Sequence, residues 1–378
     1  MTSRIGLAVL ALVLAPAVVG AVDYTPVTCT AAKAYAGPPR HAPVDLAAVQ
    51  PAGDLRAELG ASTDARLAAA FDKAFAATKA HAMTVAVAIP GRGIWTMQRG
   101  DARPLFYWAS TGKQATAIVI LQLAEEKRLN LSDPIARWIA GVPNGDVITI
   151  AHLLNHTSGL FSANEDLRIH RENRRLDAAA ELAVLQRHGA MACPGERWRY
   201  SNSGYALLGR VIEQVEGRSL ADVITSRIIT PLGLKEMRVP ASTSSVADIA
   251  APVSDTAEPA IDITVPGAAG PLAASAHDML LFQQALLDGR LLNAATRARM
   301  LAEPYPMFES GTFYGLGVML YDIANAPINW IGHSGGAPGV KAVSIYAPGQ
   351  NAFAAVALTG DGSAEATANA LLKALHGP

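Results

Sequence analysis

Residues 110–124 read STGKQATAIVILQLA, a short polar start that runs directly into an apolar helix, and this stretch decides the fold. The helix predicted at about 111–127 is apolar on almost every side, so it belongs in the centre of a domain. Ser110 and Lys113 stand three residues apart at its start, which places both side chains on one helical face. The stretch therefore predicts a buried central helix that presents a hydroxyl and an amine together.

The pattern Ser-x-x-Lys at 110–113 indicates nucleophilic catalysis. A serine hydroxyl is a poor nucleophile until a base takes its proton. A lysine in an apolar, desolvated place loses proton affinity and can be that base or a proton relay. The alternative interpretation is a helix N-cap followed by a solvated lysine. Since this S-x-x-K occurs once in the chain and opens its most apolar helix, Ser110 and Lys113 are the candidate nucleophile and base.

Two further patterns also occur once each in the chain. In Tyr200-Ser201-Asn202, a phenol near cations can donate or accept a proton, and the amide two residues on can orient a substrate. In His333-Ser334-Gly335-Gly336, small residues let a substrate backbone lie close to a strand, and a free N–H can bind an oxyanion. Each pattern alone also has a purely structural interpretation. The first could be an ordinary aromatic residue beside a turn, and the second a structural histidine.

Other patterns point to different chemistry and are weaker. Gly332 to Gly336 fits the G-x-S-x-G nucleophile elbow, with Asp361 and His376 following in order, but no helix follows it as the elbow requires. His152 and His156 are spaced like zinc ligands, yet Leu153 stands where a zinc peptidase has glutamate, so a structural role is favoured. The sequence therefore predicts no metal and no cofactor.

Length and composition limit the function classes. The chain has 378 residues, 51% hydrophobic and 17% charged, which supplies a large core and excludes a disordered chain. The formal net charge is −1 and no basic stripe is present, so a nucleic-acid partner is disfavoured. We expect a small-molecule or peptide substrate; the oligomeric state stays open.

The first residues carry the pattern of a secretory signal peptide. Arg4 is the only charge before Asp23, residues 5–15 are apolar, and small residues at 19–21 suit a cleavage site. We expect cleavage, no membrane span afterwards and export to the periplasm or medium; an uncleaved anchor is the alternative. Cys29 and Cys193 could form a disulfide in that compartment, or stay unpaired.

The remaining chain has strands at both ends and helices between them. Two β-prone runs, 84–89 and 94–98, flank Pro90-Gly91-Arg92-Gly93 and predict a hairpin. Later strands are expected at 314–321, 328–332, 340–346 and 352–358, before a final helix from about 363. This order predicts a sheet built from distant segments, with a helical insertion.

The three motifs, in this order, resemble those of the serine β-lactamase and penicillin-binding-protein superfamily, and within it the class C β-lactamase-related hydrolases. The similarity covers most of residues 62–375 and includes ITIAHLLNHTSGL at 148–160. Further matching positions are Pro194-Gly195, Leu207-Leu208-Gly209, Pro231-Leu232-Gly233 and Asp278.

The resemblance implies a role for each motif residue. Ser110 is the nucleophile, Lys113 and Tyr200 share the proton transfers, and His333 completes the catalytic group. Substrate contacts are implied for Asn202, Ser334, Gly335 and Gly336. The backbone N–H groups of Ser110 and Gly336 are expected to form the oxyanion hole. His333 stands where many β-lactamases carry lysine, and a mostly neutral histidine attracts a substrate carboxylate less strongly.

The fold that the resemblance implies is α/β (α+β), with a mainly antiparallel sheet flanked by helices and an all-helical subdomain. We expect a signal peptide at 1–21, an N-terminal arm at 22–60 and a hydrolase domain at 61–378, its α/β part at about 61–110 and 275–378 and its helical part at about 111–274. The expected function is hydrolysis of an ester or amide, such as a D-configured cell-wall peptide or a small ester. A true β-lactamase and a non-catalytic penicillin-binding sensor or scaffold are the alternatives.

Overall fold

The computed structural model of the chain describes residues 24–49, 51, 53, 55, 59, 61–172, 176–240, 246–308, 311–322 and 329–376. The signal peptide predicted at 1–21 lies outside the described residues. Within the described ranges, no helix is both long and apolar enough to cross a membrane.

An eight-stranded antiparallel sheet forms the centre of the fold, in the order β2-β1-β11-β10-β9-β8-β7-β6. Its strands come from both ends of the chain, as predicted: β1 (Ala82–Ile89), β2 (Gly93–Arg99), β6 (Tyr305–Pro306), β7 (Thr312–Tyr314), β8 (Met319–Asp322), β9 (Asn329–Ala337), β10 (Val340–Ala347) and β11 (Ala352–Thr359). The predicted hairpin joins β1 to β2, and β1 pairs with β11, which brings the two ends of the chain together.

Both faces of the sheet are covered by helices, which is why β1, β10 and β11 are buried along their whole length. Helices α1 (Ala61–Thr78) and α11 (Ala364–His376) pack on one face, where Val85 and Val87 point. Helices α2 (Lys113–Glu125) and α9 (Ala276–Leu287) belong to the core on the other face. Small side chains there, such as Ala86, let the second layer approach the sheet closely.

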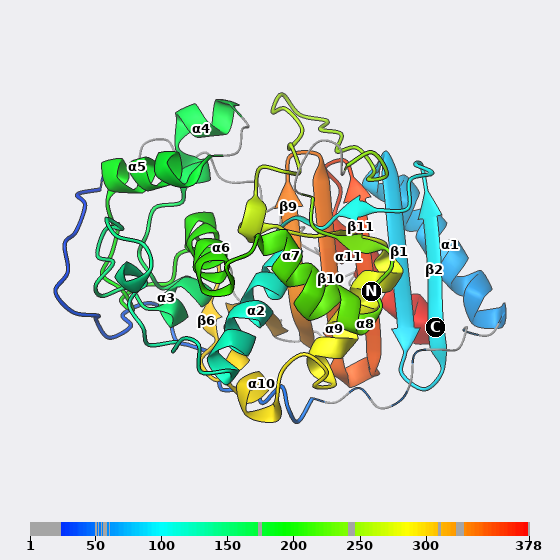
Figure 1. Cartoon of the computed structure of the whole chain (residues 1–378). Helices are drawn as coiled ribbons and strands as arrows, with labels where there is room; N and C mark the ends of the chain where they lie inside the picture. Colours follow the sequence, from blue (N-terminus) through cyan, green and yellow to red (C-terminus); the bar gives the residue numbers. More distant parts are fainter. Residues whose placement is uncertain are drawn as a thin grey trace, which may run out of the picture.

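The middle of the chain is mostly helical and lies to the left of the sheet in Figure 1, with α3, α4, α5 and α6. Its helices are α3 (Ile150–Leu154), α4 (Leu167–Glu172), α5 (Ala178–His188), α6 (Asn202–Glu216), α7 (Leu220–Ile224) and α8 (Thr230–Leu232), followed later by α10 (Ala294–Met300). A small sheet of β3 (Phe106–Tyr107), β5 (Ala273–Ala274) and β4 (Met237–Arg238) also forms. The division into an α/β and a helical part stays a prediction.

The strand predicted at 314–321 is wrong in one respect, because the structure has two strands there. Gly317 adopts a left-handed backbone with φ +76°, and the N–H of Gly315 donates to the carbonyl of Val318 at 2.8 Å. This tight turn reverses the chain between β7 and β8, which then pair antiparallel. The glycines mark the turn, and a continuous strand could not accommodate it.

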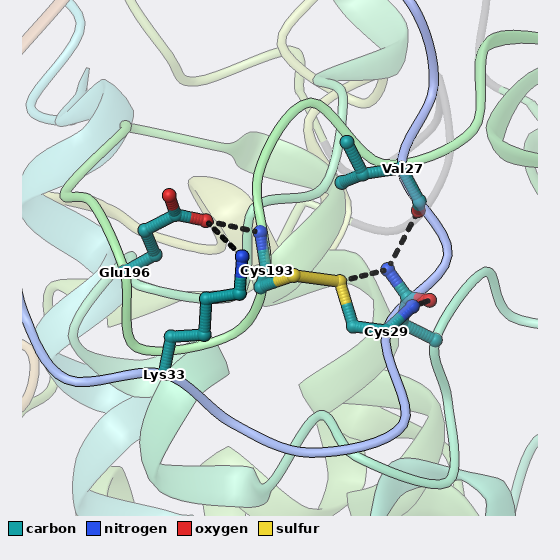
Figure 2. The surroundings of a disulfide bond; sticks show 6 residues. Val27, Cys29, Lys33, Cys193 and Glu196 are labelled. Atoms are coloured by element: carbon teal, nitrogen blue, oxygen red, sulfur yellow. Dashed lines mark hydrogen bonds and ion pairs between the residues drawn. A yellow bond between two sulfur atoms is a disulfide. The ribbon is translucent and has the colours of Figure 1, made fainter.

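Residues 27–36 of the N-terminal arm run beside residues 190–196 and are tied to them by a disulfide. Cys29 and Cys193 are bonded, which answers the question that the sequence left open. Figure 2 shows Lys33 and Glu196 beside the disulfide, paired at 3.9 Å. The N–H groups of Val27 and Lys33 donate to the carbonyls of Ala190 and Pro194. The arm therefore secures the segment that leads to Tyr200.

Candidate active site

Ser110 lies in a single 3-10 turn, η1 (Ala109–Gly112), that leads into α2. The turn is fixed by Trp108, a fully buried side chain whose Nε1–H donates to the carbonyl of Ala274 at 3.0 Å. Ala109 adopts a left-handed backbone with φ +45°, which is unusual for a residue other than glycine. Ser110 itself is half-buried, so its hydroxyl lies at the edge of the core with access from outside.

The Lys113 side chain is fully buried beneath Ser110, with its Nζ 3.1 Å from the Ser110 Oγ. Its Nζ also contacts the Asn202 Oδ1 at 2.7 Å and the Ala269 carbonyl at 2.6 Å. Burial holds the pKa of Lys113 well below its ordinary value. A neutral amine has two N–H groups and one lone pair. Because the amide and carbonyl oxygens only accept, they take both N–H groups, and the lone pair is left for the Ser110 hydroxyl proton.

Tyr200 and Asn202 flank the start of α6. Ser201 is the N-cap, and its hydroxyl accepts from the N–H of Gly204, so the residues on either side of it have fixed directions. Burial raises the pKa of Tyr200, and a hydrogen bond with Ser110 opposes that rise. The Lys113 Nζ lies 4.9 Å from the centre of the Tyr200 ring. Tyr200 is therefore a protonated phenol in contact with both the candidate nucleophile and the candidate base.

Asn164 is part of this site, and sequence reasoning missed it. Its Oδ1 accepts from the Asn202 Nδ2 at 3.0 Å and from the Ser162 hydroxyl at 2.6 Å. These bonds orient the Asn202 amide so that its oxygen faces Lys113. Asn164 lies four residues after the end of the HTSGL stretch, in a short turn (Ala163–Glu165), and no spacing rule marks it in the sequence.

Strand β9 passes directly beside η1 at Gly335. A Cβ added to Gly335 would lie 2.5 Å from the Trp108 carbonyl oxygen and 2.8 Å from the Ser110 nitrogen, so no larger residue fits. The Thr111 hydroxyl donates to the His333 carbonyl at 3.4 Å and links the same two segments. Gly336 follows and is half-buried. The structure thus brings Gly335 of β9, the residue before Gly336, next to the backbone of the candidate nucleophile.

His333 lies beneath the site, although the sequence predicted it as a catalytic group. Its side chain is 1% exposed, and its Nδ1 donates to the Ser334 carbonyl at 2.5 Å. Its Nε2 therefore accepts from the Tyr314 hydroxyl at 2.9 Å. Burial and the nearby Lys113 lower the pKa of His333 to about 3. His333 is an uncharged, enclosed partner of Tyr314 rather than a cation that faces a substrate.

The predicted substrate contact of Ser334 is wrong for its side chain. The Ser334 hydroxyl is fully buried and contacts the Met319 Sδ at 3.7 Å. Side chains alternate along a strand, so Ser334 points to the face opposite His333 and Gly335. Its burial also excludes the nucleophile elbow at 332–336. Of the two histidines spaced like zinc ligands, His152 has a structural contact, since its Nδ1 accepts from the N–H of Thr149 in a helix cap.

A cluster of aromatic side chains supports the site from below, and the sequence did not predict it. Tyr205 donates to the Leu154 carbonyl at 2.9 Å and lies 3.2 Å from the Tyr314 hydroxyl. His156 packs among Tyr200, Tyr205 and Tyr314, with ring centres 4.2, 5.2 and 4.6 Å away. The sequence predicted only a structural role for His156, and no motif connected it with Tyr200.

The family described as "Beta-lactamase" matches residues 67–377 of the chain. Penicillin-binding protein 4 of Amycolatopsis lactamdurans is 28% identical over 308 residues, which are 72% of this chain and 76% of that protein. Penicillin-binding protein 4* of Bacillus subtilis (strain 168) is 41% identical over 143 residues, which are 36% of this chain and 30% of that protein. The chain spans less than two thirds of the length of the B. subtilis relatives that it matches.

Solved structures with the same fold include two relatives above one quarter identity. A D-stereospecific amidohydrolase from Streptomyces sp. is 27% identical, with a TM-score of 0.69 over 81% of this chain and 97% of that chain. A penicillin-binding protein from Bacillus halodurans is 26% identical, with a TM-score of 0.69 over 81% of this chain and 98% of that chain. The predicted fold class is confirmed by these similarities.

Proposed function

The chain belongs to the beta-lactamase family of serine hydrolases, and from this premise we propose that it is an exported hydrolase that cleaves an amide or ester through an acyl-enzyme on Ser110. One observation carries the proposal: the buried Nζ of Lys113 lies 3.1 Å from the Ser110 Oγ. The pKa of this lysine is held well below its usual value by burial, so a base is in place for the hydroxyl proton. The narrower assignment to the class C group stays a prediction.

Acylation follows from these contacts. The Ser110 proton moves to the Lys113 lone pair, and the Ser110 Oγ forms a bond to the substrate carbonyl carbon. The carbonyl oxygen becomes an oxyanion, which the N–H groups of Ser110 and Gly336 stabilise. Tyr200 gives its proton to the leaving nitrogen or oxygen as the bond to carbon breaks, and Lys113 returns a proton to Tyr200.

Deacylation uses the same groups in reverse with water. Water loses a proton to the lone pair of neutral Lys113 and attacks the acyl carbon, and the Ser110 Oγ leaves and takes that proton back from Lys113. Asn202 bonds Lys113 through its oxygen and keeps one N–H beyond that given to Asn164, which is available to a substrate carbonyl.

Because His333 is neutral, the site favours a substrate that has no carboxylate next to the bond that is cleaved. A neutral imidazole that is enclosed and bonded to Tyr314 offers no positive charge to a carboxylate. An amide or ester without a carboxylate therefore fits the site better than a β-lactam, which carries one. The name of the similar Streptomyces amidohydrolase, which is D-stereospecific, supports the same substrate class.

Export is the second part of the proposal. The signal-peptide pattern at 1–21 motivates it, and the disulfide between Cys29 and Cys193 supports it, because disulfides persist in oxidising compartments. Expression of the full chain with a C-terminal tag tests this part. We expect a mature protein outside the cytoplasm whose first residue lies near position 22; a full-length cytoplasmic protein would contradict export.

Activity is tested with the mature protein and its S110A variant. One sample of each protein is treated with a fluorophosphonate probe, and a separate, unlabelled sample is assayed with a panel of D-amino acid amides, a D-alanyl-D-alanine peptide, short nitrophenyl esters and nitrocefin. We expect labelling of the wild type alone and turnover of amides or esters. Equal labelling of both proteins would falsify the assignment of Ser110. Nitrocefin turnover above all others would identify a β-lactamase, and labelling without any turnover would identify a sensor.

A further inference from the structure

His156 makes three contacts with the segment that carries Tyr200, and the proposed mechanism uses none of them. Its carbonyl accepts from the N–H of Arg199 at 2.9 Å. Its Nδ1 accepts from the N–H of Ser201 at 3.2 Å. Its ring packs on the Tyr200 ring, with centres 4.2 Å apart and planes inclined by 35°. The residues before and after Tyr200 and the Tyr200 ring itself are therefore all held by one residue.

The backbone of His156 makes this geometry possible. It adopts a left-handed conformation with φ +63°, directly after the short helix α3. This conformation turns the carbonyl and the ring of one residue toward the same neighbouring segment, which an ordinary helical residue does not do. A left-handed backbone is strained for a residue other than glycine. In this strained conformation, His156 makes its three contacts with the Tyr200 segment.

The hydrogen bond to Ser201 requires an uncharged imidazole. Because Nδ1 accepts the Ser201 N–H, the single proton of the neutral ring is on Nε2. Burial lowers the pKa of His156 well below its ordinary value, and the nearby Lys113 and His333 lower it further. Among the described residues, no hydrogen-bond partner is within reach of the buried Nε2. The ring is thus kept in place by its acceptor nitrogen and by the surrounding aromatic faces.

We propose that His156 is a positioning residue that clamps Tyr200, so that the phenol points at the Ser110 hydroxyl. This proposal rests on the proposed function, in which Tyr200 moves protons at Ser110. In the part of the chain that the structure describes, the other aromatic rings near Tyr200 lie farther away, with the ring centres of Trp198, Phe308 and Tyr314 at 6.4, 6.1 and 6.3 Å. Loss of the clamp lets the phenol leave its position without removing any group that touches the substrate.

Two variants each remove one half of the clamp. H156N keeps an acceptor near the Nδ1 position and tolerates a left-handed backbone, but it loses the ring contact with Tyr200. H156F keeps an aromatic ring and loses the acceptor for Ser201. H152N is the control, because His152 lies in the same stretch and caps Thr149 without contact to Tyr200.

The experiment measures the rate of Ser110 labelling by a fluorophosphonate in a double-mutant cycle with Y200F. We expect H156N and H156F each to slow labelling about 10- to 100-fold, with H152N close to wild type. In the Y200F background, either change should slow labelling less than about threefold, because His156 acts through Tyr200. Melting temperatures identify any variant that fails to fold, and the other variant then answers the question.

An equal loss with and without Tyr200, or no loss in its presence, overturns the positioning role. Failure of the proposed function gives a different result, since wild type would then show no labelling that depends on Ser110.

Discussion

Replacement of Gly335 by alanine tests the close approach of β9 to the candidate nucleophile. The added methyl would lie 2.5 Å from the Trp108 carbonyl oxygen, where ordinary contact begins at 3.4 Å. Strand β9 is paired with β8 and β10 on its two sides, and Trp108 is fully buried, so neither segment can withdraw freely. The gap between β9 and η1 must open by about 0.9 Å, a displacement of the size that costs about 100-fold in rate.

The assay compares kcat/KM and the melting temperature of G335A with those of wild type and G204A. Gly204 is the matched control, because a methyl added there meets its nearest neighbours at 3.5 Å, an ordinary contact. We expect G335A to lose roughly 100-fold in kcat/KM and about 1–3 kcal/mol of unfolding free energy from overpacking. A G335A enzyme with nearly full activity would refute the reasoning, because β9 would then not fix the position of Ser110.

Three further predictions follow from buried groups. In K113M, we expect kcat to fall at least about 100-fold because the base is lost. The Asn202 and Ala269 oxygens also lose their donor. An unchanged kcat in steady-state kinetics would exclude Lys113 as the base. The double variant C29S/C193S loses about 2–5 kcal/mol of stability, measured by thermal unfolding, whereas an equal melting temperature would show that the arm is held without the disulfide. Folded His333 stays neutral down to about pH 3 while the unfolded side chain binds a proton near pH 6.5, so stability is lost as pH falls through this window. H333Q removes this loss of up to about 1.4 kcal/mol per pH unit, and identical acid unfolding curves for H333Q and wild type would contradict it.

The sequence located the residues of the site better than it described their roles. Ser110 and Lys113 were predicted from a three-residue spacing that any helical turn brings together, and the structure has their side chains 3.1 Å apart. His333 and Ser334 were predicted from the same short motif, yet one faces Tyr314 and the other faces Met319. Because side chains alternate along a strand, two adjacent residues of one motif point to opposite faces of the sheet.

Asn164 and His156 show what a motif search does not detect. Each acts on a residue about 40 positions away in the chain, Asn164 on Asn202 and His156 on the segment around Tyr200. Neither contact has a spacing rule, because both depend on how the turn after α3 packs against the start of α6. The left-handed backbone of His156 is a tertiary outcome, since histidine has only a weak local preference for it.

Local physics makes three features predictable from the residues alone: the apolar helix that begins with a serine and a lysine, the hairpin around 90–93 and the glycines where the chain turns. Periodicity and turn chemistry act over a few residues, so they can be predicted without coordinates. Which groups lose their contact with water depends instead on how distant segments pack together. Burial of Lys113 favours its neutral form, burial of His333 removes its charge, and both effects arise from packing between distant segments.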